Sequence, residues 1–350
     1  MHTFYYPGHI RHDPAQHNKP NTPLPTQRFH ETAQRGAIIH AAIKEANLGP
    51  ITKPADFSID PIGEIHEYGF LNLLQNAHER MINEESDQLA VPYTFLKNQI
   101  GPRRPRSVWG QLGYYAYDGA SPILEHTWDV AYWNAQVAIS AAALINAQGG
   151  ELAYALCRPP GHHAGPNFYG GACYLNNAAI AAHWLVQQGK RVAILDLDYF
   201  HGNGTQAIFY GRSDILYCSI HADPLYEYPY FWGYADEFGV GSGKGYNFNY
   251  PLSRRAGADV YLATVDNALD RIRLYVPDLL LISLGVNFIQ DDPVSQFQIP
   301  AETLTTIGHT LAKLNLPTVI VQEGGSVRDD LGQNVVTFLT ALQGDVNKNS

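Results

Sequence analysis

The chain has 350 residues, of which 45% are hydrophobic and 16% are charged, and its formal net charge is −10. This composition is typical of one globular domain with a large core, and no apolar run approaches the roughly 20 residues that span a bilayer. The negative charge repels nucleic-acid phosphates and favours cationic ligands. We therefore expect no nucleic-acid partner and no membrane partner, and a cationic small molecule such as a polyamine as a possible ligand.

The N-terminal residues show neither a basic leader nor an apolar run before a small-residue cleavage site. Three cysteines, Cys157, Cys173 and Cys218, stand in apolar, strand-like contexts at wide spacing. These features are typical of a reducing compartment, so we expect a cytoplasmic protein without a disulfide framework.

The central and C-terminal parts of the chain alternate between predicted strands and predicted helices. Short apolar runs rich in β-branched residues predict strands over 152–157, 191–198, 214–221, 278–285 and 317–322. Between them, 3.6-residue periodicity predicts helices over 174–188, 257–275 and 301–314. This alternation predicts an α/β protein with a central parallel sheet flanked by helices on both faces.

We expect a single domain over 1–344, followed by a polar C-terminal tail over 345–350. The segment 91–121, which is rich in proline, arginine and aromatic residues, is predicted to be a long irregular loop within the domain. Long loops in compact domains are usually functional or interfacial.

Polar clusters follow each predicted strand, where the ligand site of a parallel sheet lies. They are RPPGHH (158–163), DLDYFHGNG (196–204), SIHADP (219–224), LGVNF (284–288) and EGGS (323–326). Alone, Asp196 and Asp198 with His201 are equally typical of capping carboxylates at a turn. Their combination with the His162–His163 pair indicates a catalytic or metal site.

Together, these motifs resemble the histone deacetylase superfamily, and most closely the bacterial acetylpolyamine amidohydrolases. The likeness also includes IHEYGFLNLLQNAH (65–78), GYYAYDGASPI (113–123), TWDVAYWNAQVA (127–138) and CYLNNAAIAA (173–182), and so covers nearly the whole chain. It implies the arginase/deacetylase α/β fold.

The resemblance also implies a zinc-dependent hydrolysis of linear amides. In that family, the second Asp of the DxD motif, the residue two positions later and an Asp after the SLG motif hold zinc. A tandem His pair acts as general base and general acid, and a Tyr after the EGG turn polarises the amide carbonyl. Asp198 matches the first zinc ligand, and His162 and His163 match the catalytic pair.

Other positions depart from the family pattern. Phe200 and Asn287 stand at the two other zinc-ligand positions, and Ser326 stands at the position of the catalytic Tyr. Gly171 and Ala172 are at the substrate-binding wall, where Ala172 replaces an aromatic residue of the acyl tunnel.

Phe offers no lone pair and Asn offers only a neutral oxygen, whereas a catalytic zinc site needs three protein ligands. His201 is not expected to substitute, because in an extended chain past Asp198 it faces the opposite side. We therefore expect zinc to be absent or weakly bound.

A second metal position in the family, for potassium, uses oxygen ligands that this chain retains. They are Asp196, Asp198, Ser219 and the backbone carbonyls of Phe200 and Ile220. A role of Asp196 as the carboxylate that orients His162 is compatible with this position.

Three hypotheses follow. The first is a deacetylase-like protein that has lost zinc-dependent hydrolysis and is inactive, with a binding, sensing or partner role. The second is a metal-independent enzyme that uses His162 and His163. The third is an active amidohydrolase of acetylpolyamines or acetyllysine with a rebuilt ligand set. The resemblance also implies a homodimer that forms through 91–121.

Overall fold

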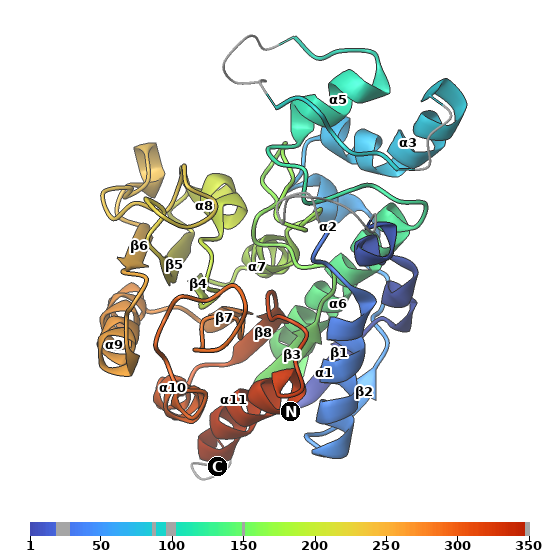
Figure 1. Cartoon of the computed structure of the whole chain (residues 1–350). Helices are drawn as coiled ribbons and strands as arrows, with labels where there is room; N and C mark the ends of the chain where they lie inside the picture. Colours follow the sequence, from blue (N-terminus) through green and yellow to red (C-terminus); the bar gives the residue numbers. More distant parts are fainter. Residues whose placement is uncertain (19–28, 86–88, 96–102, 149–150, 347–350) are drawn as a thin grey trace.

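A single parallel sheet organises the chain (Figure 1). The computed structural model describes residues 1–18, 29–85, 89–95, 103–148 and 151–346. Within these residues, eight strands form the sheet in the order β2-β1-β3-β8-β7-β4-β5-β6, and each neighbouring pair is parallel. The strands are β1 (His2–Tyr5), β2 (Ile51–Thr52), β3 (Leu152–Leu156), β4 (Val192–Asp196), β5 (Ile215–Ala222), β6 (Asn247–Leu252), β7 (Leu279–Leu284) and β8 (Thr318–Gln322).

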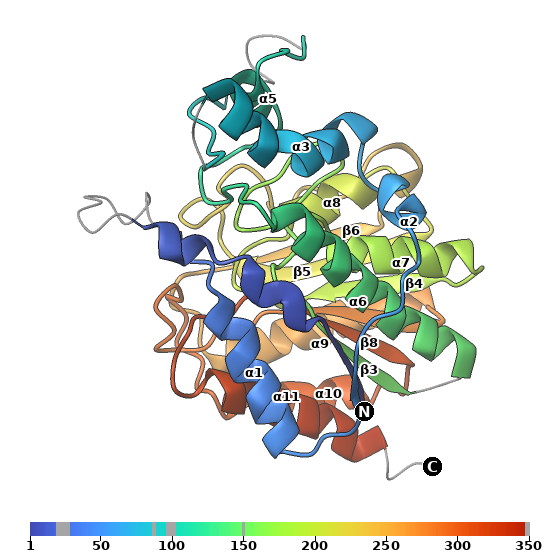
Figure 2. The same cartoon turned by 90° about the vertical axis from the view of Figure 1, so that its right-hand side faces the viewer.

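Helices cover both faces of the sheet, as the sequence predicts (Figures 1 and 2). One face packs on α6 (Thr127–Gln148) and α7 (Asn177–Gln187). The other face packs on α1 (Ala33–Glu45), α9 (Ala258–Tyr275), α10 (Thr303–Ala312) and α11 (Leu331–Val346).

Successive residues of each central strand belong alternately to two apolar cores, one on each face of the sheet. Val192 and Ile194 of β4 lie in the core beside α6 and α7, whereas Ala193 and Leu195 lie in the other. This follows from the period of two along a strand, and explains why the central strands are largely apolar on both faces. The predicted α/β architecture with a buried parallel sheet is confirmed.

Further helical elements complete the described fold. They are α2 (Asp60–Gly63), α3 (Tyr68–Glu85), α5 (Val108–Tyr115), α8 (Asn203–Phe209) and the 3-10 helices η1 (Pro7–Arg11), η2 (Pro14–His17) and η4 (Gly241–Gly243). Helices α3 and α5 lie side by side at one end of the molecule in both views (Figures 1 and 2). Among the described residues, no helix is both long and apolar enough to cross a membrane.

Three expectations about local structure need correction. The segment 91–121 is not wholly irregular, because α5 forms within it; residues 96–102 lie outside the described part. Strand β4 ends at Asp196, so the chain is not extended past Asp198. Helix α11 continues to Val346, so the expected boundary at 344 falls inside a helix, and 347–350 are outside the described residues.

A buried arginine fixes the N-terminal segment to the sheet just before the histidine pair. Arg158 is 1% exposed, and its Nε lies 2.8 Å from Glu31 Oε1. Its guanidinium also donates to the backbone oxygens of His9 and Thr32 at 2.7 Å. A buried charge is tolerated only when it is paired and hydrogen-bonded. This network therefore holds the segment that leads from β3 to His162.

Candidate functional site

The polar clusters that follow β3, β4, β5, β7 and β8 converge at one edge of the sheet, as the sequence predicts. In the register of the sheet, Asp196 at the end of β4 lies opposite Ser219 of β5 and Ser283 of β7. His162 and His163 are 2% and 3% exposed, and their ring centroids lie 4.0 Å apart. The predicted histidine pair and aspartates are therefore brought together in one buried site.

The carboxylate of Asp198 is held by donors from three segments of the chain. Its Oδ1 accepts from Phe200 N at 3.0 Å and from Asn287 Nδ2 at 2.9 Å. Its Oδ2 accepts from Gly324 N at 2.8 Å. Asp198 is 1% exposed, so these donors replace the water that a carboxylate needs.

The orientation of the Asn287 amide is fixed by its two partners. Asn287 Oδ1 accepts from Tyr199 N at 3.1 Å, and a backbone N–H can only donate. The amide nitrogen must therefore face Asp198. A rotated amide would set two donors against each other at Tyr199 and two acceptors against each other at Asp198.

Phe200 lies beside the histidine pair with its ring half-buried. Its ring centroid is 5.0 Å from Tyr199, 5.6 Å from Tyr228 and 6.5 Å from His163. These contacts are apolar, and a phenyl ring carries no ligand atom for a cation. Phe200 therefore contributes shape and surface at this position.

His162 is oriented by a carboxylate beneath it. Its Nδ1 donates to Asp196 Oδ2 at 3.0 Å, which confirms the proposed orienting role of Asp196. Burial alone would lower the pKa of His162, but Asp196 and Asp198 raise it to about 10. Glu323 accepts from the backbone N–H groups of Gly161 and His162, and burial raises the pKa of Glu323 to about 7.

His163 has a different environment. Its Nδ1 donates to Asn203 Oδ1 at 2.8 Å, a neutral acceptor at the start of α8. Burial, followed by the neighbouring charge of His162, holds the pKa of His163 well below its usual range. The pair thus combines one imidazole that favours the positively charged form, His162, with one that favours the neutral form, His163. This arrangement is suited to acid and base roles.

Ser326 is held by a carboxylate. Its Oγ donates to Asp292 Oδ1 at 2.7 Å, and its backbone N–H donates to Asp292 Oδ2 at 3.2 Å. Burial raises the pKa of Asp292. The hydroxyl at the position of the family's catalytic Tyr is therefore hydrogen-bonded to Asp292.

His201 is buried against the imidazole of His221, with ring centroids 4.5 Å apart, under the backbone of Gly233. Within the described residues, no hydrogen bond joins His201 to Asp198. Past Asp198 the chain turns and is not extended as expected. The His201 ring nevertheless lies against His221, and not against Asp198.

The potassium-type residues lie at and beyond the end of β4 and within β5. Asp196 Oδ1 accepts from Asp198 N at 3.1 Å, and Ser219 Oγ lies 2.8 Å from His221 Nδ1. Ile220 follows Ser219 in β5, and both are fully buried. Asp196 and Ser219 thus lie opposite each other on adjacent strands, whereas Asp198 and Phe200 follow the end of β4.

Sequence reasoning missed a cluster that covers the histidine pair. The phenol of Tyr228 donates to Asp118 Oδ2 at 2.7 Å and contacts the hydroxyl of Tyr117. Gly171 N donates to the same oxygen of Asp118 at 2.8 Å. No sequence signal joined Tyr228 to Asp118, because 110 residues separate them.

The wall residues Gly171 and Ala172 both have left-handed backbone conformations, with φ of 57° and 64°. A Cβ at position 171 would collide with the ring of His163 and come within 2.8 Å of the Tyr228 hydroxyl. Only glycine allows this close approach. The predicted substrate-binding position therefore lies directly against the histidine pair.

Among the described residues, no group of three or more His, Cys, Asp and Glu side chains is arranged to hold a metal ion. Of the three positions where the family places zinc ligands, only Asp198 carries a charged ligand atom. The oxygen of Asn287 faces Tyr199 N. The side chains present therefore do not fit a catalytic zinc ion.

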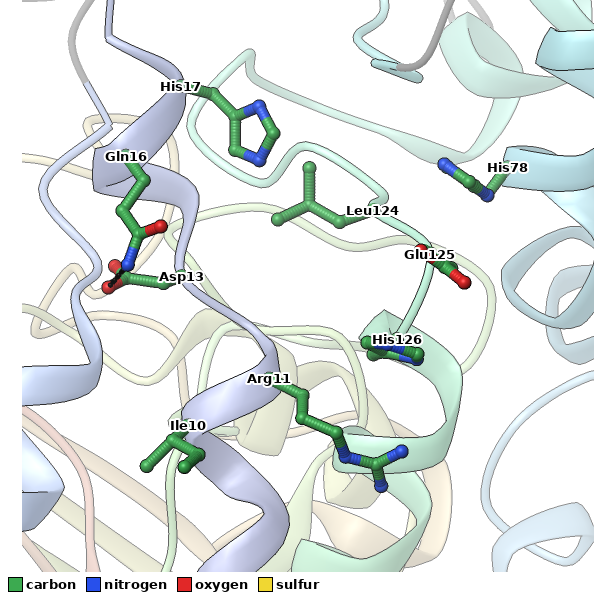
Figure 3. A pocket seen from close by; sticks show the side chains of 9 residues that line it. All are labelled: Ile10, Arg11, Asp13, Gln16, His17, His78, Leu124, Glu125 and His126. Atoms are coloured by element: carbon green, nitrogen blue, oxygen red, sulfur yellow. Dashed lines mark hydrogen bonds between the residues drawn. The ribbon is translucent and has the colours of Figure 1, made fainter.

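A separate cavity of about 200 Å³ lies between η1, η2, His78 of α3 and the turn before α6 (Figure 3). His17 and Leu124 point towards its centre, and His78 approaches from the other side. None of the predicted site residues lines this cavity. Its chemistry is therefore distinct from that at the strand ends.

Comparisons with known proteins agree with the fold. The chain matches the histone deacetylase domain over residues 29–342. It is 46% identical to acetylpolyamine amidohydrolase 1 of Pseudomonas aeruginosa over 318 residues, which cover 90% of this chain and 91% of that protein.

The chain is also 41% identical to the acetylpolyamine amidohydrolase of Burkholderia pseudomallei over 340 residues, 97% of each protein. The crystal structure of acetylpolyamine aminohydrolase from Burkholderia pseudomallei superposes with a TM-score of 0.91 at 40% identity, over 98% of each chain. The chain therefore belongs to the histone deacetylase family.

Proposed function

We propose that this protein is a deacetylase-like protein that binds amine ligands related to acetylpolyamines without zinc-dependent hydrolysis. The observation that carries the proposal is the hydrogen bond from Asn287 Nδ2 to Asp198 Oδ1. An amide N–H stands beside the one retained zinc-ligand carboxylate, and Phe200 supplies no donor atom. A zinc ion needs lone pairs directed towards it, and of the three zinc-ligand positions only Asp198 offers them.

The second candidate function is hydrolysis of acetylated polyamines. It is favoured by the names of the relatives and by the retained pairs His162–Asp196 and His163–Asn203. In such an enzyme, a zinc ion would activate water and polarise the carbonyl. The two functions differ in zinc content and in sensitivity to chelators, so both can be measured on one preparation.

Restoring the family residues tests the proposal directly. We expect the parent protein to contain well below one zinc per chain and to release no acetate from acetylputrescine or acetyllysine. Phe200→His with Asn287→Asp should restore stoichiometric zinc with poor turnover. Adding Ser326→Tyr should raise turnover by about 10²–10³-fold, the usual effect of one oxyanion donor.

Elemental analysis and acetate release should be measured with and without a chelator. Chelator-sensitive turnover by the parent at the rate of the triple variant would establish the second candidate instead. Turnover by the parent that a chelator leaves unchanged would indicate metal-independent chemistry at His162 and His163.

The charge at position 287 provides a test that does not depend on activity. Asn287→Asp places a second carboxylate within hydrogen-bond distance of Asp198, in a site where Asn287 is 4% exposed. Without a cation, repulsion raises the folded-state pKa of the introduced carboxyl above its unfolded value. Its effect on stability is then absent below about pH 4 and grows as the pH rises.

We expect Asn287→Asp to lower the free energy of unfolding at pH 7.5 by about 3 kcal/mol or more, and by less at pH 5. Asn287→Ala is the matched control, because it removes the hydrogen bond without adding charge and should show a similar loss at both pH values. Chemical denaturation measures both variants. Equal losses for Asn287→Asp at the two pH values would contradict the charge argument.

We also propose that potassium binds at Asp196, Asp198, Ser219 and the backbone oxygens of Phe200 and Ile220. Hard oxygen ligands suit a monovalent cation, and the site would tie β4 to β5. We expect a melting temperature a few degrees higher in potassium chloride than in tetramethylammonium chloride. Ser219→Ala should abolish the difference; identical melts of the parent in both salts would rule out this site.

A homodimer through 91–121 is proposed for the same protein. The described part of this segment exposes Tyr93 at 73%, together with Arg103, Arg104 and Arg106. Aromatic residues and arginine are enriched at interfaces. Light scattering at micromolar concentration should give twice the 38.8 kDa chain mass, and Tyr93→Ser should weaken the dimer. A monomeric parent would refute it.

A further inference from the structure

Two aromatic rings cover the histidine pair and remain partly exposed. Phe200 and Tyr228 meet edge to face, with centroids 5.6 Å apart at an angle of 85°. Tyr228 also lies edge to face against His163, at 5.0 Å and 88°. His163 is 3% exposed, whereas both aromatic rings are half-buried. A solute that enters the site therefore meets these two rings before the imidazoles.

The ring of Tyr228 is made electron-rich by its hydroxyl partner. The phenol donates to Asp118 Oδ2 at 2.7 Å, so an acidic side chain lies at the hydroxyl end of the ring. Asp118 is held in place by the backbone N–H groups of Ala120, at 2.9 Å, and Gly171, at 2.8 Å. A cation placed over the ring gains both from its quadrupole and from this carboxylate.

The charges around the rings also favour a cation. Asp118, Asp196 and Asp198 are three acidic side chains in this part of the molecule, and Asp196 is hydrogen-bonded to His162. Phe200 and Asn287 are neutral. The side chains at the two replaced zinc-ligand positions therefore add no positive charge beside these acidic groups.

We infer that the base of this site recognises a free primary ammonium, the unacetylated end of a diamine or polyamine, in preference to an acetamide. The inference rests on the proposed function, because a bound zinc dication would repel an ammonium and attract an amide oxygen. The aromatic faces of Phe200 and Tyr228 suit the ammonium, with Asp118 as the nearest hydrogen-bonded carboxylate. An acetamide carries no charge to engage either feature.

Calorimetry on the full chain tests this inference with three ligands of one carbon skeleton. Putrescine has two ammonium ends, N-acetylputrescine has one and N,N′-diacetylputrescine has none. We expect putrescine and N-acetylputrescine to bind about tenfold or more tightly than the diacetyl compound. Equal affinity for all three, or no binding of putrescine, would overturn the inference.

Ring variants locate the preference. Tyr228→Leu should remove it, and Phe200→Leu should reduce it, because each deletes one aromatic face. Phe231→Leu is the matched control, since this ring is 74% exposed on the same loop and should leave the preference unchanged. If Tyr228→Leu does not fold, Phe200→Leu decides the matter, and an unchanged preference in that variant would contradict the assignment.

Acetate release measured on the same samples separates the two claims. Chelator-sensitive acetate release from the diacetyl compound would show that the proposed function is wrong. Equal binding of all three ligands without acetate release would leave the proposed function intact and reject ammonium recognition alone.

Discussion

The carboxylate of Asp198 is buried, and the rest of the site depends on how its charge is compensated. Three N–H groups supply the compensation, from Phe200, Gly324 and the Asn287 side chain. These donors belong to the segments that follow β4, β7 and β8. The same hydrogen bonds that satisfy the charge therefore also join three strand ends, and the site holds its shape through protein groups alone.

This compensation explains how the scaffold can keep its form with Phe200 and Asn287 at two expected ligand positions. A buried carboxylate without a cation or donors would cost several kcal/mol. Asn287 is suited to this position because its oxygen is taken by Tyr199 N and its nitrogen is left for Asp198. The histidine pair is supported separately by Asp196, Glu323 and Asn203, so it persists independently of residue 287.

The sequence was sufficient to predict the central strands and the convergence of their carboxyl ends, because buried parallel strands are continuous apolar runs. It did not predict β1, β2 or β6. Strand β6 (Asn247–Leu252) reads NFNYPL, with polar residues and a proline that are typical of an edge strand. Helix α5 was also missed, since its VWGQLGYY sequence contains two glycines and follows a run of arginine and proline.

Within the site, the residues themselves were predictable but several of their partners were not. The bonds from Asn287 to Asp198, from Ser326 to Asp292 and from Tyr228 to Asp118 join residues separated by 89, 34 and 110 positions. Side-chain pairing over such distances follows from the packed sheet and has no local pattern. For Asn287, these partners decide which side-chain atom faces Asp198.

The most direct test is a crystal structure of the parent protein grown with excess zinc, with anomalous scattering measured at the zinc absorption edge. We expect no anomalous peak within ligand distance, about 2.2 Å, of the Asp198 carboxylate, and an Asn287 amide still bonded to it. A fully occupied peak bound by Asp198 with further protein ligands would contradict it.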